Sequence, residues 1–124
     1  MVLIHGGKAF DFVAVEDCGL ANVCAMKADT VDQFYNVGTG KRTTLKQLAE
    51  MLVELTGCTK PIIYAPRSQA TLVRNRIGSP KKASSEIGFT STIDLREGLK
   101  RLIEWRVNHK AEVASRRLSV GLSA

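Results

Sequence analysis

The sequence predicts an α/β fold: a small, partial sheet of three to four short strands together with about four helices. Short segments of strand-type residues alternate along the chain with longer segments whose apolar residues recur at helical spacing, and this alternation favours layered α/β packing. The chain has 124 residues, 44% of them apolar and 24% charged, which is typical of a globular protein. A sheet of so few strands leaves unpaired edges that need a neighbour. We therefore expect a single domain at residues 1–117 that is part of a larger assembly, with residues 118–124 as a disordered tail.

Four segments have the composition of strands. Residues 2–5 and 10–15 lie on either side of the Gly6-Gly7 turn, and each is rich in apolar residues. Residues 33–37 (QFYNV) are closed by the turn Gly38-Thr39-Gly40. Residues 61–64 (PIIY) form a last, brief strand before a polar loop at 65–77. The predicted sheet is thus built from strands of four to six residues, at or below the usual strand length in globular proteins.

The first two helices are predicted from their ends as well as from their periodicity. One begins at Glu16-Asp17, where a carboxylate accepts hydrogen bonds from unpaired backbone donors, and continues to about Lys27. The next begins with a capping box formed by Thr44 and Gln47. Its apolar residues follow helical spacing, and Gly57 ends it because glycine readily adopts positive φ.

The last two helices follow the polar loop. Ser79-Pro80 predicts a helix with serine at the N-cap and proline at the first helical position, ending near Glu86, before Gly88. Asp94, paired with Glu97 in a second capping box, predicts a final helix through Val107. The element order is therefore β-β-α-β-α-β-α-α.

Composition narrows the function classes. The formal charge of +6 is carried partly by the last helix, where interleaved acids indicate a solvated face and make nucleic acid an unlikely partner. No apolar run is long enough to cross a membrane. Three cysteines without a CxxC motif indicate reduced thiols and a cytoplasmic location. The two histidines, His5 and His109, lie at opposite ends of the chain without nearby metal-ligand spacing, so no metal site is predicted.

The glycine turn at residues 38–40 precedes a helix and so invites comparison with phosphate-binding loops. A Walker loop needs Lys followed by Ser or Thr, but Lys41 is followed by Arg42. A dinucleotide fingerprint needs a third glycine, but residue 43 is Thr. The turn is therefore predicted to be structural. Asp11, Glu16 and Asp17 are likewise predicted to form turns and helix caps, and no catalytic or cofactor-binding residues are predicted.

The polar loop carries the candidate binding residues. Arg67, Arg74 and Arg76 fall within ten residues, and planar guanidinium groups match the paired oxygens of a diphosphate in geometry and charge. Solvated arginines, or arginines paired with carboxylates, are the alternative interpretation.

Five motifs in order resemble the C-terminal half of the extended short-chain dehydrogenase/reductases, the NAD-dependent nucleotide-sugar epimerases and dehydratases. They are DFVAVED at 11–17, FYNVGTG at 34–40, RNRIGSPKKA at 74–83, EIGF at 86–89, and LREGL with IEW at 95–105. The resemblance covers about residues 3–107 and is closest to UDP-glucose 4-epimerases.

The resemblance implies a lobe that binds a nucleotide-diphosphate sugar, with an arginine after the 61–64 strand at the diphosphate. Arg67 is the nearest candidate, and Arg74 and Arg76 are alternatives. Many members carry another arginine where this chain has Phe10. NAD and the catalytic Tyr-x-x-x-Lys belong to the family's N-terminal half, and neither that motif nor a cofactor fingerprint occurs in this sequence.

Two functions follow as hypotheses. In the first, the chain is the nucleotide-sugar-binding lobe of an epimerase or dehydratase, binds UDP- or dTDP-sugars weakly, and is not expected to be active by itself. A Rossmann-half protein would then be its partner. In the second, the chain is a repurposed interaction module that binds no ligand and associates with another protein or with itself as a homo-oligomer.

Overall fold

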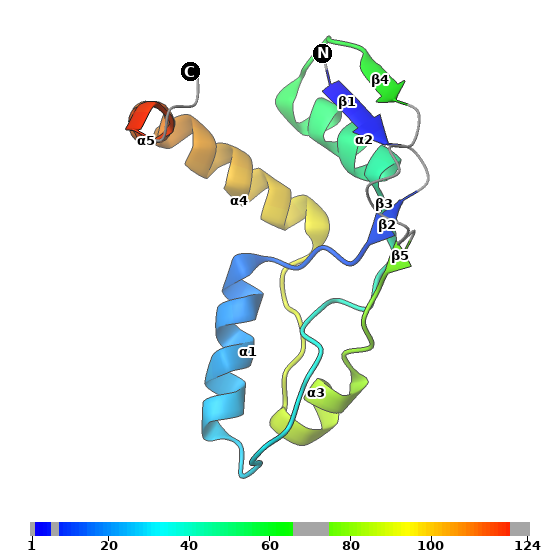
Figure 1. The fold of residues 1–124 in the computed structure, drawn as a ribbon, viewed down its shortest axis with the longest axis vertical. Helices are drawn as coiled ribbons and strands as arrows, with labels where there is room; N and C mark the ends of the chain where they lie inside the picture. The colour runs from blue at the N-terminus through cyan, green and yellow to red at the C-terminus, as the bar shows by residue number, and fades with distance from the viewer. Residues whose placement is uncertain (1, 6–7, 66–74, 120–124) are drawn as a thin grey trace.

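The computed structural model describes residues 2–5, 8–65 and 75–119, and its order of elements is shown in Figure 1. The helices are α1 (Val15–Lys27), α2 (Leu45–Thr56), α3 (Lys81–Ile87), α4 (Leu95–Asn108) and α5 (Lys110–Ser119). The strands are β1 (Val2–His5), β2 (Ala9–Phe10), β3 (Thr43–Thr44), β4 (Ile62–Ala65) and β5 (Asn75–Arg76). The predicted α/β class is confirmed, with short strands and one more helix than expected.

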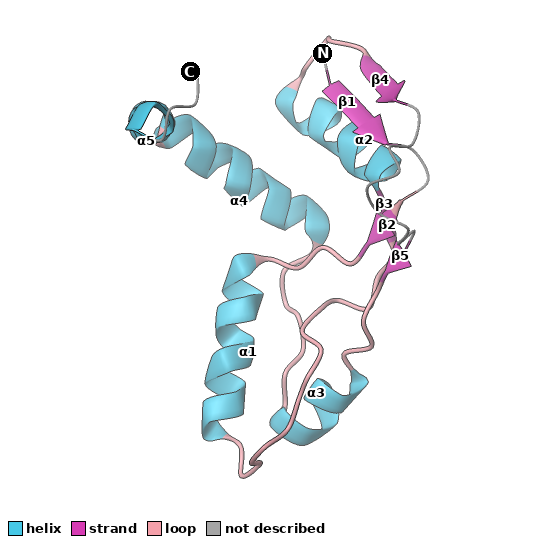
Figure 2. Ribbon diagram, viewed as in Figure 1, coloured by secondary structure: helices cyan, strands magenta, loops and turns pink. Residues whose placement is uncertain are grey.

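The strands form two small sheets rather than one. β1 pairs with β4 in parallel, with Val2 opposite Ile62. β2 lies at the centre of the other sheet, antiparallel to β3 on one side and parallel to β5 on the other. Figure 2 shows the two sheets one above the other, with α2 beside β1. Both sheets are open, so neither provides a closed core.

The core lies between α1 and α3. Phe89 is completely buried there and packs with Ile87 and with two small side chains that let the helices approach, Ala21 and Ala83. Cys24, Ala28 and Tyr35 border this cluster. Outside it many large apolar side chains are exposed, including Met26 and Phe34. Burial is thus concentrated in one small region.

Several predicted helix ends are confirmed. Thr44 and Gln47 form both halves of the capping box, and Gly57 ends α2 in the left-handed region. Gly88 ends α3 in the same way. The Asp94 side chain accepts a hydrogen bond of 2.9 Å from the N–H of Glu97 at the start of α4. These signals are local, and each involves residues within a few positions of one another.

Three predicted elements are wrong in whole or in part. Residues 33–37 form no strand, because the described chain offers no strand beside them. The predicted strand at 10–15 is limited to Ala9–Phe10, and α1 already begins at Val15. Pro80, not Ser79, occupies the N-cap of α3, and no side chain caps that helix.

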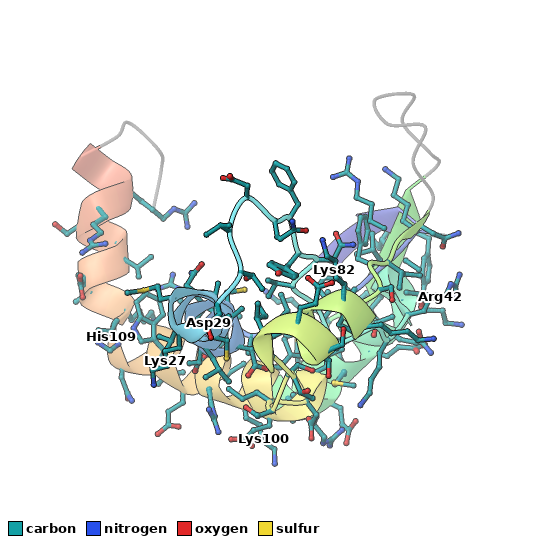
Figure 3. All side chains as sticks on the ribbon, turned by 90° about the horizontal axis from the view of Figure 1, so that it is seen from below. Lys27, Asp29, Arg42, Lys82, Lys100 and His109 are labelled. Atoms are coloured by element: carbon teal, nitrogen blue, oxygen red, sulfur yellow. The ribbon has the colours of Figure 1, made fainter. Side chains whose placement is uncertain are left out.

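The C-terminal region departs from the prediction after α4. Helix α4 ends at its C-cap, His109, and a separate helix, α5, follows through Ser119. Helix α5 therefore extends past the proposed domain end at residue 117. Figure 3 shows α5 turning away from the end of α4. Most of the predicted tail, residues 120–124, lies outside the described residues.

Candidate functional site

Arg76 is the one predicted site residue whose structure is described, and the three-stranded sheet determines its position. Thr43, Phe10 and Arg76 are direct partners across β3, β2 and β5, and partners across a sheet share one face. The carbonyl of Arg76 also accepts a 3.0 Å hydrogen bond from the N–H of Asp11. The arginine strand is thus held beside the DFV segment that precedes α1.

The two paired side chains, Arg76 and Phe10, differ in charge and in exposure. Arg76 is exposed, and no carboxylate among the described residues forms an ion pair with it. Phe10 is half-buried and packs edge-to-face on Phe12, with ring centroids 6.0 Å apart. Phe10 therefore contributes an apolar surface beside a guanidinium group. Arg67 and Arg74 lie outside the described residues, so their assignment stays a prediction.

The backbone N–H groups of the glycine turn donate to a carboxylate of the same chain, that of Asp11. The N–H groups of Thr39 and Gly40 donate to Asp11 at 3.0 and 2.8 Å, and the Thr39 hydroxyl also donates to this carboxylate. The donors that a phosphate would need are therefore already used. This geometry explains physically why the turn is structural, and it links the DFV and GTG motifs into one unit.

Gly38 is required by the same contact. A Cβ atom at this position would lie 2.5 Å from Oδ2 of Asp11, which is fixed by its hydrogen bonds and cannot move without losing them. We expect Gly38→Ala to lower the free energy of unfolding by about 1–3 kcal/mol, the usual cost of overpacking. Chemical denaturation monitored by circular dichroism measures this change.

Gly19 provides the matched control. It lies within α1, and a Cβ there would meet nothing within 4 Å. Gly19→Ala should therefore raise the free energy of unfolding by roughly 0.5–1 kcal/mol, because alanine restricts the unfolded chain and favours helix. Equal changes in the two variants would show that the Asp11 contact does not constrain residue 38.

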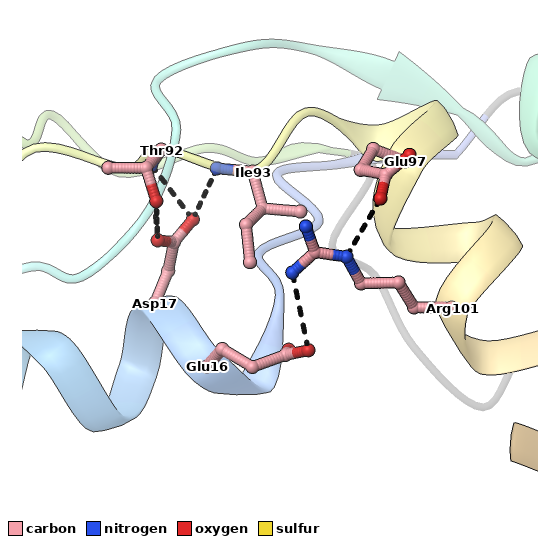
Figure 4. A network of polar contacts seen from close by, with 6 residues as sticks. All are labelled: Glu16, Asp17, Thr92, Ile93, Glu97 and Arg101. Atoms are coloured by element: carbon pink, nitrogen blue, oxygen red, sulfur yellow. Dashed lines mark hydrogen bonds and ion pairs between the residues drawn. The ribbon is translucent and has the colours of Figure 1, made fainter.

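Asp17 has a role that sequence reasoning missed. The prediction that Asp17 caps α1 is wrong, because the N-cap is Ala14. The Asp17 carboxylate instead accepts hydrogen bonds from a segment 75 positions later in the chain. The donors are the N–H of Thr92 at 3.1 Å, the Thr92 hydroxyl at 2.9 Å and the N–H of Ile93 at 3.1 Å (Figure 4). Only 1% of Asp17 is exposed. This contact fixes the loop before α4 against α1.

The pKa of Asp17 follows from these surroundings. Burial of the carboxylate opposes ionisation, but the N–H groups of Thr92 and Ile93, the Thr92 hydroxyl and the charge of Arg101 outweigh it. The pKa of Asp17 is therefore held below its ordinary value. The carboxylate is ionised at neutral pH and serves as a structural anchor.

Exposed ion pairs connect the helices around this anchor. Arg101 of α4 lies 2.8 Å from Glu97 and 3.8 Å from Glu16 of α1 (Figure 4). Arg96 forms a two-pronged pair with Glu54 of α2, and its hydrogen bonds and charge hold the pKa of the Glu54 carboxyl below the ordinary value. These contacts link α4 to α1 and to α2 at the surface.

An apolar groove lies between α2, α4 and the segment leading into α1. Its volume is about 630 Å³, and its walls include Leu48, Leu52, Leu99 and Trp105. Trp105 also stacks on His109 with ring centroids 4.8 Å apart. Within the described residues, no group of three or more His, Cys, Asp or Glu side chains could hold a metal ion. Glu16, Asp94 and Arg101 also line the groove, and Glu16 and Arg101 are paired with each other at 3.8 Å.

Known proteins define the class to which this geometry belongs. No protein-family model matches the chain. It is 34% identical to the UDP-glucose 4-epimerase of Corynebacterium glutamicum over 68% of this chain and 26% of that protein. The described fold, an open α/β lobe built around the DFV and GTG motifs, is that of the extended short-chain dehydrogenase/reductases.

Two solved structures are similar. The UDP-glucose 4-epimerase of Thermotoga maritima, crystallised with UDP-glucose, superposes with a TM-score of 0.81 and 35% identity, covering 86% of this chain and 35% of the epimerase. The Bordetella bronchiseptica enzyme WbmF, in complex with NAD+ and UDP, has a TM-score of 0.76 and 28% identity, with 93% and 34% coverage.

The chain belongs to the NAD-dependent nucleotide-sugar epimerase and dehydratase family, and it fits a C-terminal fragment of such a protein. It spans about a third of the length of the curated relatives that it matches. Among the described residues, no helix is long and apolar enough to span a membrane.

Proposed function

We propose that this chain is the lobe that binds a nucleotide-diphosphate sugar in an epimerase or dehydratase, that it binds such a ligand weakly, and that it has no turnover alone. Family membership and the ligands named for similar structures, UDP-glucose and UDP, support this function. The absence of a Tyr-x-x-x-Lys motif and a cofactor fingerprint from the sequence supports inactivity. The free cysteines support a cytoplasmic location.

The single observation that carries the proposal is the exposed guanidinium of Arg76 beside Phe10. Arg76 is the direct partner, across β2 and β5, of Phe10, the position where many family members carry an arginine. A guanidinium group next to an apolar ring suits a diphosphate that is attached to a planar base.

The test is isothermal titration calorimetry with UDP-glucose and with UDP. We expect a weak but measurable affinity for the unchanged chain. Arg76→Ala should weaken it about tenfold or more, because charge-assisted hydrogen bonds to phosphate are lost. Arg106→Ala on α4 removes the same exposed charge far from the sheet, and it should leave the affinity within a factor of two.

Each outcome has a defined meaning. If neither ligand binds the unchanged chain, the proposed function is wrong. If the ligand binds and Arg76→Ala has the affinity of the control, the diphosphate contact is assigned to the polar loop instead. Titrations of Arg67→Ala and Arg74→Ala then show which of these arginines makes the contact. Turnover of UDP-glucose by the isolated chain in the presence of NAD would contradict the proposed inactivity.

A further inference from the structure

Ser79 does not have the role that the sequence predicts for it. Its hydroxyl is predicted to cap α3, but Pro80 occupies the N-cap and no side chain caps that helix. Ser79 is exposed, and among the described residues its hydroxyl makes no hydrogen bond. An exposed hydroxyl without a partner is open to chemical modification.

Two serines close to Ser79 differ from it in this respect. The Ser84 hydroxyl lies 3.4 Å from the hydroxyl of Thr90, and the Ser85 hydroxyl donates to the carbonyl of Lys82 at 3.1 Å. Both serines belong to α3, where the backbone is helical. Ser79 instead lies in the loop between β5 and α3 (Figure 1). Of these three serines, Ser79 is therefore the one that combines an unbonded hydroxyl with a non-helical backbone.

The loop that carries Ser79 is suited to binding in an extended form. Pro80 disfavours the helical conformation at Ser79, and the structure shows neither helix nor turn at residues 77–80. The loop also rests on the glycine turn, since a Cβ atom on Gly40 would lie only 3.2 Å from the Pro80 ring. Because the backbone is already held on one side, a partner that binds this loop orders it at little further entropic cost.

The residues around Ser79 are basic. Arg76 lies three positions before it, and Lys81 and Lys82 lie two and three positions after it. No acidic residue occurs between positions 75 and 85. Arg76 and Lys81 are exposed, and within the described part of the chain neither forms an ion pair. The local positive charge attracts an acidic binding surface and favours an added phosphate.

Pro80 adds a second recognition feature. It has no backbone N–H, so a groove with an apolar wall at this position accepts proline, whereas any other residue would bury an unpaired donor there. Protein kinases that select serine before proline discriminate in this way, and charge patterns beside the serine add to their specificity. The sequence Ser79-Pro80-Lys81-Lys82, with Arg76 before it, carries both features.

We infer that Ser79 is a phosphorylation site for a proline-directed protein kinase, and that its phosphorylation weakens binding of a nucleotide-diphosphate sugar at Arg76. The second half of this inference rests on the proposed function. In the reaction the Ser79 hydroxyl oxygen forms a bond to the γ-phosphorus of ATP, the bond from that phosphorus to the β–γ bridging oxygen breaks, and ADP leaves. The hydroxyl proton passes to the catalytic carboxylate of the kinase.

The effect on the candidate site follows from distance and charge. Three residues of extended chain span at most about 11 Å, so a phosphate on Ser79 is within reach of the long Arg76 side chain. This phosphate carries about −1.5 to −2 charges at neutral pH, and a guanidinium group pairs with it through two parallel hydrogen bonds. A phosphate attached to the same chain therefore competes with the diphosphate of a ligand for Arg76.

Incubation of the chain with ATP and a cyclin-dependent kinase, followed by peptide mass spectrometry, tests the modification with no sugar nucleotide present. We expect a phosphate at Ser79. Ser79→Ala should remove it, and Pro80→Ala should slow its incorporation about tenfold or more, because the kinase would then bury an unpaired N–H. Ser85→Ala is the matched control, and it should be phosphorylated as fast as the unchanged chain.

Isothermal titration calorimetry with UDP compares the phosphorylated chain with the unmodified chain. Phosphorylation should weaken the affinity about tenfold or more, because Arg76 is then paired with the phosphate. Ser79→Glu, which adds a single carboxylate, should weaken it less. Ser85→Glu adds the same charge within α3, and it should leave the affinity within about a factor of two.

Two results overturn the inference. One is a chain that takes up no phosphate at Ser79, or takes it up equally fast after Pro80→Ala. The other is a phosphorylated chain that binds UDP as tightly as the unmodified chain, which removes the coupling to Arg76. A chain that binds no UDP in either form refutes the proposed function and the coupling together, while phosphate uptake still decides whether Ser79 is modified.

Discussion

Replacing Phe89 with alanine is expected to lower the free energy of unfolding by about 3–5 kcal/mol, the usual cost of truncating a fully buried aromatic side chain. Phe89 is completely buried and is the largest side chain in the α1–α3 cluster. Its neighbours Ala21 and Ala83 are too small to fill the space that the ring would leave. The cavity would therefore persist, and the two helices would lose their main contact.

Urea denaturation followed by far-ultraviolet circular dichroism measures this loss. Phe34→Ala is the matched control, because the same side chain is removed from a position that is 92% exposed. The control should change stability by less than about 0.5 kcal/mol. Similar losses in the two variants would mean that the α1–α3 cluster does not dominate the stability of this chain.

Replacing Asp17 with alanine is expected to lower the free energy of unfolding by about 1–3 kcal/mol, because two partly buried backbone N–H groups would lose their acceptor. These donors belong to Thr92 and Ile93, which lie between α3 and α4. Their release would free the start of α4 from α1. Asp29→Ala, at an exposed carboxylate, is the control and should have little effect.

The same carboxylate makes stability depend on pH. The pKa of Asp17 is lower in the folded chain than in the unfolded chain, so its contribution is complete above the unfolded value of about 4. The contribution falls as the pH drops below about 4 and is lost through the lower, folded pKa. Denaturation midpoints measured from neutral to acid pH should show a decline that is smaller in Asp17→Ala. An identical decline in both proteins would assign the acid sensitivity to other groups.

The contrast between the start of α2 and the contacts of Asp17 explains which features the sequence could predict. Helix ends depend on residues three or four positions apart, so the Thr44–Gln47 box and the glycine at 57 could be recognised directly. The partners of Asp17 lie 75 positions away, and no local spacing signals them. Asp17 therefore resembled a helix cap, although its real role is tertiary.

Residues 33–37 illustrate a different limit. A strand is defined by its neighbour, and composition alone cannot supply one. The sequence correctly indicates a segment suited to pairing, but the described chain contains no strand in position to accept it. The candidate site is similar. The residue types indicated Arg67, with Arg74 and Arg76 as alternatives, and the place of Arg76 beside Phe10 depends on a parallel pairing between β2 and β5 that sequence spacing does not reveal.

The carboxylate of Asp11 has a consequence for any solute anion that meets this protein. Because the side chain is tethered to the same fold as the Thr39 and Gly40 donors, it competes at a fixed effective concentration, on the order of millimolar or more, that dilution cannot reduce. Free phosphate must displace a ligand that never diffuses away. The turn thus behaves as a permanently self-inhibited anion site, and a designer who wished to open it would first have to remove Asp11.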